Sequence, residues 1–172
     1  MTHKPILSPS GIPYVTHGWS PVTGCTPISA GCDHCWARLM LHRYRRPETP
    51  TVHLERMCAP VYRKQPALIF VCPMGDLFHE AVDDAVIAEV FVAMASAPQH
   101  RYLLLTKRPD RMAQWSTRFT DRLGVGVSVE NQAAADERIP VLVKIPSKFR
   151  FLSMEPLLGP VLLHSSFLAV TP

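Results

Sequence analysis

The chain has 172 residues, of which 47% are hydrophobic and 19% are charged, so its composition is that of a globular protein long enough for one domain with a buried core. It contains neither an apolar run of the roughly 20 residues that a membrane span needs nor a signal peptide at its start, and we therefore expect a cytoplasmic protein without membrane contact. The net charge of +4 at pH 7 permits contact with nucleic acid without requiring it.

Short apolar runs alternate with segments of helical spacing behind a polar, proline-dotted N-terminus. We expect residues 1–13 to form a flexible arm and residues 14–172 to form a single domain. The apolar runs predict strands at residues 14–19, 67–72, 101–105, 123–129 and 149–153, and more weakly at 161–170.

The segments of helical spacing predict helices at residues 35–45, 83–97, 109–119 and 132–143. In the first of these helices, the residues at helical spacing are Trp36, Leu39, Met40 and Arg43. Asp83 or Asp84 is expected to cap the second helix. Residues 46–66 contain several prolines and are expected to form a connecting loop, with a helical turn near Glu55.

This alternation predicts an α/β fold in which parallel strands are joined by helical crossovers. Polar residues follow four of the predicted strands directly: Asp76, Lys107, Ser128, Glu130, Asn131 and Glu155. In a (β/α) barrel the carboxyl ends of all strands meet at one mouth, whereas an open doubly wound sheet gathers such residues at one switch point. No G-x-G-x-x-G pattern follows the first strand, which also disfavours a nucleotide-binding open sheet. The sequence therefore favours a TIM-like (β/α) barrel.

Three of the five cysteines, Cys25, Cys32 and Cys35, share one Gly/Pro/Ser-rich loop with the spacing C-x6-C-x2-C. In a reducing compartment such cysteines are metal ligands or buried free thiols and not disulfides. Three thiolates are one short of a closed zinc site and one short of a fully ligated iron–sulfur cluster. A zinc site would need a fourth ligand, and the three candidates are His34, His42 and Cys72.

Eight short motifs occur in order along residues 17–163. They are WSPVTGC at 19–25, GCDHC at 31–35, FVCPMGDLFHE at 70–80, APQH at 97–100, LTKRP at 105–109, GVSVEN at 126–131, ADERIP at 135–140 and FLSMEPLLGP at 151–160. Together they resemble the phage-associated three-Cys-motif protein family, which is similar to radical S-adenosylmethionine enzymes. The resemblance implies a radical-SAM-like barrel and a phage or prophage origin. It further implies a [4Fe–4S] cluster on the three cysteines.

The same resemblance implies how S-adenosylmethionine would be held. An open iron of the cluster would chelate its amino and carboxylate groups, and one electron would cleave the sulfonium to give a 5′-deoxyadenosyl radical. Asp76 is expected to hold the methionine ammonium group, and Lys107 with Arg108 to meet a carboxylate or phosphate. The residues expected to hydrogen-bond the ribose or to face the same mouth are Ser128, Glu130, Asn131 and Glu155. A helix cap or a solvated turn is the structural alternative for each of them.

The chain also departs from the pattern that it resembles. The standard spacing of radical enzymes is C-x3-C-x2-C, whereas a gap of six residues separates Cys25 from Cys32. The family continues beyond the motif at 151–160, so we expect a member that is truncated at the C-terminus and lacks the last strands of its barrel.

Three functions remain open: a radical S-adenosylmethionine-type enzyme of unknown substrate, a zinc-stabilised binding module without catalysis, and a degenerate fragment of the enzyme. A partner protein encoded nearby is expected to accompany the chain. The basic run at residues 42–46 offers weak support for contact with nucleic-acid phosphates, because cations are also common at helix C-termini.

Overall fold

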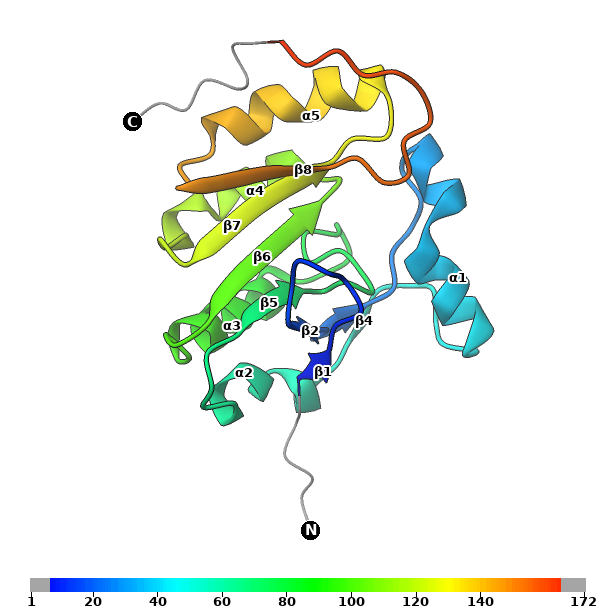
Figure 1. Cartoon of the computed structure of the whole chain (residues 1–172). Coiled ribbons are helices and arrows are strands. Elements are labelled where there is room, and N and C mark those ends of the chain that lie inside the picture. The colour runs from blue at the N-terminus through cyan, green and yellow to red at the C-terminus, as the bar shows by residue number, and fades with distance from the viewer. Residues whose placement is uncertain (1–6, 165–172) are drawn as a thin grey trace.

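The computed structural model of the chain describes residues 7–164 and centres on a sheet of six strands (Figure 1). The strands lie in the order β1 (Ser8–Pro9), β2 (His17–Trp19), β5 (Leu68–Val71), β6 (Arg101–Thr106), β7 (Leu123–Ser128) and β8 (Phe149–Ser153). β1 pairs antiparallel with β2, and every later pair in the sheet is parallel. A separate antiparallel ribbon joins β3 (Val22–Thr23) to β4 (Thr51–Val52).

The helices connect these strands in turn. The α-helices are α1 (Trp36–Arg43), α2 (Ala59–Tyr62), α3 (Asp84–Ala95), α4 (Pro109–Gln114) and α5 (Gln132–Lys144). Short 3-10 helices form η1 (Ala30–His34), η2 (Leu54–Arg56) and η3 (Ser116–Arg118). None of the helices among residues 7–164 is long and apolar enough to cross a membrane.

The predicted α/β class with a parallel sheet is confirmed, whereas the barrel is not. The parallel strands lie in chain order without the reversal that defines a doubly wound sheet. The sequence predicted a partial barrel that lacks its last strands and therefore has open edges. In the described part of the chain, β1 and β8 are the two free edges of the sheet.

Each predicted strand and helix up to residue 153 is present, with small changes at its ends. The helix predicted at residues 109–119 ends at Gln114, and η3 follows it as a separate turn. Residues 161–164 of the weak strand predicted at 161–170 are not in a strand, and its remainder lies outside the described residues. Part of the predicted N-terminal arm belongs to the sheet, since Leu7 is buried and β1 pairs with β2.

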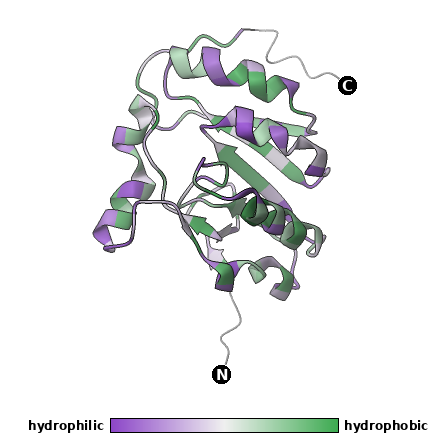
Figure 2. Cartoon of the chain, turned by 180° about the vertical axis from the view of Figure 1, so that it is seen from behind, coloured by the Kyte–Doolittle hydropathy of each residue, from purple (hydrophilic) through white to green (hydrophobic). Residues whose placement is uncertain are grey.

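The core lies between the sheet and the helices α3, α4 and α5, which run along one face of it (Figure 1). Side chains that alternate along the strands, such as Ile69, Leu104 and Val125, are fully buried on this side. The strands are coloured mostly as hydrophobic in Figure 2, whereas the helices alternate between hydrophobic and hydrophilic residues. On the other face, Phe70 and Leu103 form a smaller cluster with partly buried neighbours. This scaffold brings the carboxyl ends of five parallel strands to one edge.

Candidate functional site

A cavity of about 680 Å³ opens where the parallel strands end. The predicted site residues that border it are Cys25, Cys32, Cys35, Asp76, Lys107, Ser128 and Glu155. Another cavity, of about 650 Å³, lies over the starts of β6, β7 and β8 among side chains such as Leu103 and Phe149, and no cysteine of the described chain borders it. The thiols and most of the predicted polar residues are therefore gathered at the carboxyl ends of the strands.

Backbone hydrogen bonds fix the start of the cysteine loop. The N–H of Gly24 donates to the carbonyl of Met74 at 2.8 Å, and the N–H of Cys25 donates to the carbonyl of Glu48 at 2.7 Å. Gly24 has a φ of 81°, a conformation that residues with a side chain rarely adopt. A Cβ at this position would lie 2.1 Å from the carbonyl oxygen of Thr49. Only glycine fits where the loop leaves β3.

The variant Gly24→Ala is therefore expected to lower the free energy of unfolding by about 3 kcal/mol, because it combines backbone strain with a backbone clash. Urea unfolding followed by circular dichroism measures the change. Gly159→Ala is the matched control, since nothing lies within 4 Å of a Cβ there. Equal unfolding midpoints for the two variants would contradict the assignment.

Arg108 is the cation next to Cys25. One guanidinium nitrogen lies 3.5 Å from the Cys25 sulfur and 3.2 Å from the Asp76 carboxylate, and another lies 2.7 Å from Glu80. Burial and the negative charge of Asp76 raise the pKa of the Cys25 thiol to about 11, although Arg108 acts in the opposite direction. Cys25 is therefore a protonated thiol at neutral pH, and a metal centre would have to displace its proton.

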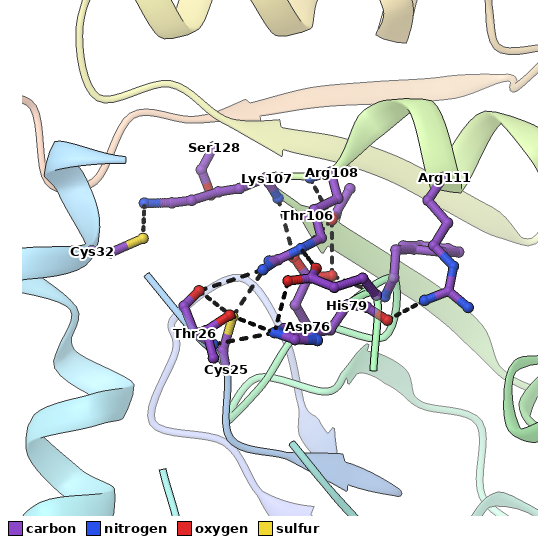
Figure 3. A network of polar contacts seen from close by, with 12 residues as sticks. Cys25, Thr26, Cys32, Asp76, His79, Thr106, Lys107, Arg108, Arg111 and Ser128 are labelled. Atoms are coloured by element: carbon purple, nitrogen blue, oxygen red, sulfur yellow. Dashed lines mark hydrogen bonds and ion pairs between the residues drawn. The ribbon is translucent and has the colours of Figure 1, made fainter. Parts of the chain in front are cut away.

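Lys107 is the corresponding cation at Cys32 (Figure 3). Its ammonium nitrogen lies 3.5 Å from the Cys32 sulfur, 3.4 Å from the Ser29 hydroxyl and 3.8 Å from the Glu130 carboxylate. Burial acts to raise the pKa of the Cys32 thiol. Hydrogen bonds with the backbone of Ile28 and Ser29, together with the charge of Lys107, outweigh burial and leave this pKa below its ordinary value. Cys32 is thus the more easily ionised of the two thiols.

The donor set offers three thiols, which is the ligand type of iron–sulfur clusters. Cys25, Cys32 and Cys35 are free thiols that border one cavity, and cations stand beside two of the sulfurs. Those cations would offset the negative charge of bound thiolates. Within residues 7–164, no three His, Cys, Asp or Glu side chains lie close enough together to hold one metal ion. Binding of a metal centre would therefore require the loop to draw the sulfurs closer together.

Asp76 borders the cavity, but its carboxylate already has several donors inside the protein. The Thr106 hydroxyl lies 2.8 and 2.9 Å from its two oxygens, and the Phe78 N–H donates at 2.9 Å. Together with Arg108, these contacts join the turn after β5 to the end of β6. Asp76 is only 5% exposed, so its first role in this structure is to position these two turns.

Glu130 does not border the cavity. It lies beneath the cysteine loop in a buried ion pair with Arg138, at 2.9 Å, and the two side chains are 1% and 2% exposed. Burial acts to raise the pKa of the Glu130 carboxyl, but a hydrogen bond with the Ser29 side chain and the charges of Arg138 and Lys107 hold this pKa below its ordinary value. Its side chain also lies 3.0 Å from where a Cβ of Gly31 would be. Glu130 therefore stabilises the cysteine loop through its hydrogen bond with Ser29 and its packing next to Gly31.

Asn131, which was expected to hydrogen-bond a ribose, instead caps a helix. Its side-chain oxygen accepts a hydrogen bond from the N–H of Ala134 at 2.9 Å, at the start of α5. Asp83 occupies the same position at α3 but makes no such bond, so its predicted capping role is not seen. The sequence offered the cap as the alternative for Asn131, and the cap bond is the side-chain contact that the structure shows.

Asn131 makes a side-chain cap bond and Asp83 does not, so replacing each with alanine tests what the cap contributes. Asn131→Ala is expected to lower the free energy of unfolding by about 1 kcal/mol, because an N–H at the start of α5 loses its acceptor. Asp83→Ala, which removes no side-chain cap bond, is expected to change stability less. Thermal unfolding of both variants compares them, and a larger loss for Asp83→Ala would reverse the assignment.

His79 holds the loop on the side of Cys25. From the sequence alone, a turn residue and a functional residue were equally expected at this position. The N–H of Ala81 donates to Nδ1 of His79 at 3.0 Å, and its Nε2 lies 2.7 Å from the Thr26 hydroxyl and 3.3 Å from the backbone nitrogen of Thr26. Burial and the charge of Arg108 lower the pKa of His79, so the ring is neutral. His79 lies within the motif at 70–80 and Arg138 within that at 135–140, but their partners are far away in sequence. The contacts of His79 with Thr26 and of Arg138 with Glu130 are therefore visible only in the folded structure.

The candidate fourth ligands for zinc differ in position. His34 and Cys72 border the same cavity as the three cysteines. Burial raises the pKa of the Cys72 thiol to about 12. The His42 side chain is 86% exposed and lies 3.7 Å from Glu48, and it is not among the residues that border the cavity.

Residues 9–168 match a protein family described as "Protein of unknown function (DUF5131)", and no curated protein matches the sequence. The fold is similar to that of spore photoproduct lyase, a radical S-adenosylmethionine enzyme. Its complex with a dinucleoside spore photoproduct aligns with a TM-score of 0.66 at 12% identity, covering 94% of this chain and 50% of that one.

Two further structures of the same enzyme also align with this chain. A cysteine-to-serine variant aligns with a TM-score of 0.66 at 13% identity, covering 87% of this chain and 48% of that one. A structure with bound S-adenosylmethionine and dinucleoside spore photoproduct aligns with a TM-score of 0.60 at 12% identity, covering 81% and 44%. The chain thus spans about half the length of the structures it matches, and the likeness is one of fold.

Proposed function

The chain belongs to the DUF5131 family of proteins of unknown function, and we propose that it is a radical S-adenosylmethionine-type iron–sulfur protein. The observation that carries the proposal is the gathering of Cys25, Cys32 and Cys35 around one cavity at the carboxyl ends of the parallel strands. The fold that it shares with a radical S-adenosylmethionine enzyme supports the same reading. The phage or prophage origin, the partner protein encoded nearby and the partial barrel implied by the sequence are part of this proposal.

When bound, a [4Fe–4S] cluster and S-adenosylmethionine would supply one-electron chemistry at the sulfonium. The chain's own residues prepare the site for these groups. Cys25, Cys32 and Cys35 would hold the cluster, while Arg108 and Lys107 place positive charge beside two of its sulfurs. These interactions favour the anionic thiolates over the thiols.

The same cations are placed to attract the carboxylate of S-adenosylmethionine, since both border the cavity. Ser128 and Glu155 border it from the ends of β7 and β8 and are the remaining candidates for polar contact with the cofactor. Asp76 and Glu130 position the two cations. Asp76 holds Arg108 in place, and Glu130 lies within ion-pair distance of Lys107.

A zinc-stabilised binding module is the second candidate function. It is favoured by His34 and Cys72, which border the same cavity and either of which would complete a set of four ligands with the three cysteines. In that case the chain would have no catalytic role. The third alternative, a degenerate fragment of the enzyme, would bind neither an iron–sulfur cluster nor zinc.

Metal analysis of the chain purified without oxygen tests these alternatives. Iron and sulfide in stoichiometric amounts, with thiolate-to-iron absorption that bleaches on reduction, support the iron–sulfur protein. Addition of S-adenosylmethionine should then perturb the electron paramagnetic resonance signal of the reduced cluster. Stoichiometric zinc without iron would establish the binding module instead. A folded chain that retains neither metal after reconstitution would overturn both metal-binding proposals.

A further inference from the structure

The helix α1 carries an apolar and aromatic stripe that faces solvent. Trp36 and Leu39 lie on one side of the helix and are 52% and 66% exposed, whereas the buried residues of α1 are Ala37 and Leu41. Helical spacing of this kind usually marks a face that packs on a core. In Figure 1, α1 instead stands beside the carboxyl ends of the strands and away from the layer formed by α3, α4 and α5.

The end of α1 and the turn after it add positive charge to this stripe. Arg43, Arg45 and Arg46 are exposed, and no carboxylate of the described chain lies within ion-pair distance of them. Tyr44, between them, is 61% exposed. Arg38, on the same helix, is different because it pairs with a carboxylate of Glu48 at 3.1 Å. The surface therefore combines two exposed aromatic rings with three unpaired cations.

This surface adjoins the proposed active site. Trp36 borders the cavity of the three cysteines and also a neighbouring cavity of about 770 Å³. Ala37, Arg38 and Leu41 border the cysteine cavity as well, so Arg43 follows the last cavity residue of α1 by only two positions. A ligand that extends over α1 would therefore reach the cavity at Trp36.

We propose that α1 and the turn after it bind single-stranded nucleic acid and present it to the cysteine cavity. Exposed aromatic side chains offer stacking surfaces for bases, and nearby arginines offer contacts for phosphates. Unpaired bases are required because bases inside a duplex are already stacked on one another. Three cations without acidic partners disfavour a neutral protein surface as the occupant. As a statement about substrate class this inference rests on the proposed function, whereas binding itself does not need the cluster.

The test uses the full 172-residue chain and a short fluorescein-labelled oligothymidine, with anisotropy measured at several salt concentrations. The triple variant R43Q/R45Q/R46Q is expected to lower the salt slope of the logarithm of affinity by about 2, since each phosphate contact on a single strand contributes about 0.7. Trp36→Leu is expected to weaken binding about tenfold without changing the salt slope, because it removes stacking and keeps an apolar side chain.

The matched control removes the same charge elsewhere. R101Q/R118Q/R122Q replaces three exposed arginines outside α1 and the turn after it and should leave the salt slope unchanged. Equal losses in the two triple variants would show that net charge alone causes binding, and would overturn the proposal. So would equal affinity for the oligothymidine–oligoadenine duplex or for polyglutamate, which would indicate a duplex or an acidic protein as the ligand. The absence of any binding would also overturn it. Iron content of the same preparation is measured separately, so failure here is distinguishable from failure of the iron–sulfur proposal.

Discussion

A chain in which Cys32 is replaced by serine is expected to lose its stoichiometric iron and the associated absorption while keeping its fold. Serine is nearly isosteric with cysteine, and its hydroxyl can keep the contacts with Lys107 and Ser29 that the thiol makes. An alcohol is a far weaker ligand for iron than a thiolate, and two remaining cysteines do not hold a cluster stably. Iron and sulfide analysis after anaerobic reconstitution measures the loss, and circular dichroism checks the fold.

Two further cysteines serve as controls for this experiment. Cys58 is exposed and is not among the residues that border the cavity, so Cys58→Ser should leave the iron content unchanged. Cys72→Ser separates the two metal proposals, because Cys72 is a candidate ligand for zinc but is not one of the three cluster cysteines. Full iron retention by the Cys32→Ser variant would show that the sulfurs around the cavity are not cluster ligands.

The variant Arg138→Met is expected to lower the free energy of unfolding by about 3–5 kcal/mol, because it leaves Glu130 charged and buried without its main partner. Arg138 also donates to the carbonyl of Ser128 at 2.8 Å, and that bond is lost as well. Because Glu130 supports the cysteine loop, the loop should also become more sensitive to limited proteolysis. Urea unfolding and digestion time courses measure these two effects.

A matched pair and a double variant sharpen this prediction. Lys148 and Asp121 form an ion pair at 2.6 Å whose side chains are 73% and 72% exposed, so Lys148→Met should cost no more than about 1 kcal/mol. Replacing Glu130 with leucine in the Arg138→Met chain should restore part of the lost stability, because both charges are then gone. Similar losses for Arg138→Met and Lys148→Met would contradict the role assigned to the buried pair.

The sequence predicted the central strands well because they are largely apolar runs whose residues are mostly buried. Residues 67–72 have no polar interruption, residues 123–129 have only Ser128, and β5 and β7 lie within these runs. The location of the site at the carboxyl ends of the strands followed from chain order alone. The partial barrel stays a prediction, because the curvature of a sheet depends on contacts between distant segments, which no local pattern reveals.

The roles of individual site residues were harder to predict. Glu130 and Asn131 are neighbours in one motif, but one forms a buried ion pair with Arg138 and the other caps α5. The helical spacing of Trp36 and Leu39 was visible in the sequence, but spacing does not say whether a stripe faces a core or solvent. Such outcomes depend on which segments pack together, and that information lies in long-range contacts.

The order of the strands in the sheet has a consequence for how the chain folds during synthesis. Within the six-stranded sheet, each new strand from β2 onward pairs with the strand of that sheet made before it. The pairings from β5 to β8 each close a loop that contains one α-helix, whereas the β2–β5 pairing closes a longer segment that contains α1, α2 and the β3–β4 ribbon, so it carries a larger entropy cost. The sheet can therefore grow in one direction as the chain leaves the ribosome, with β8 as its growing edge. The cysteine loop, which precedes β5, acquires its support from Glu130 only after β7 has emerged.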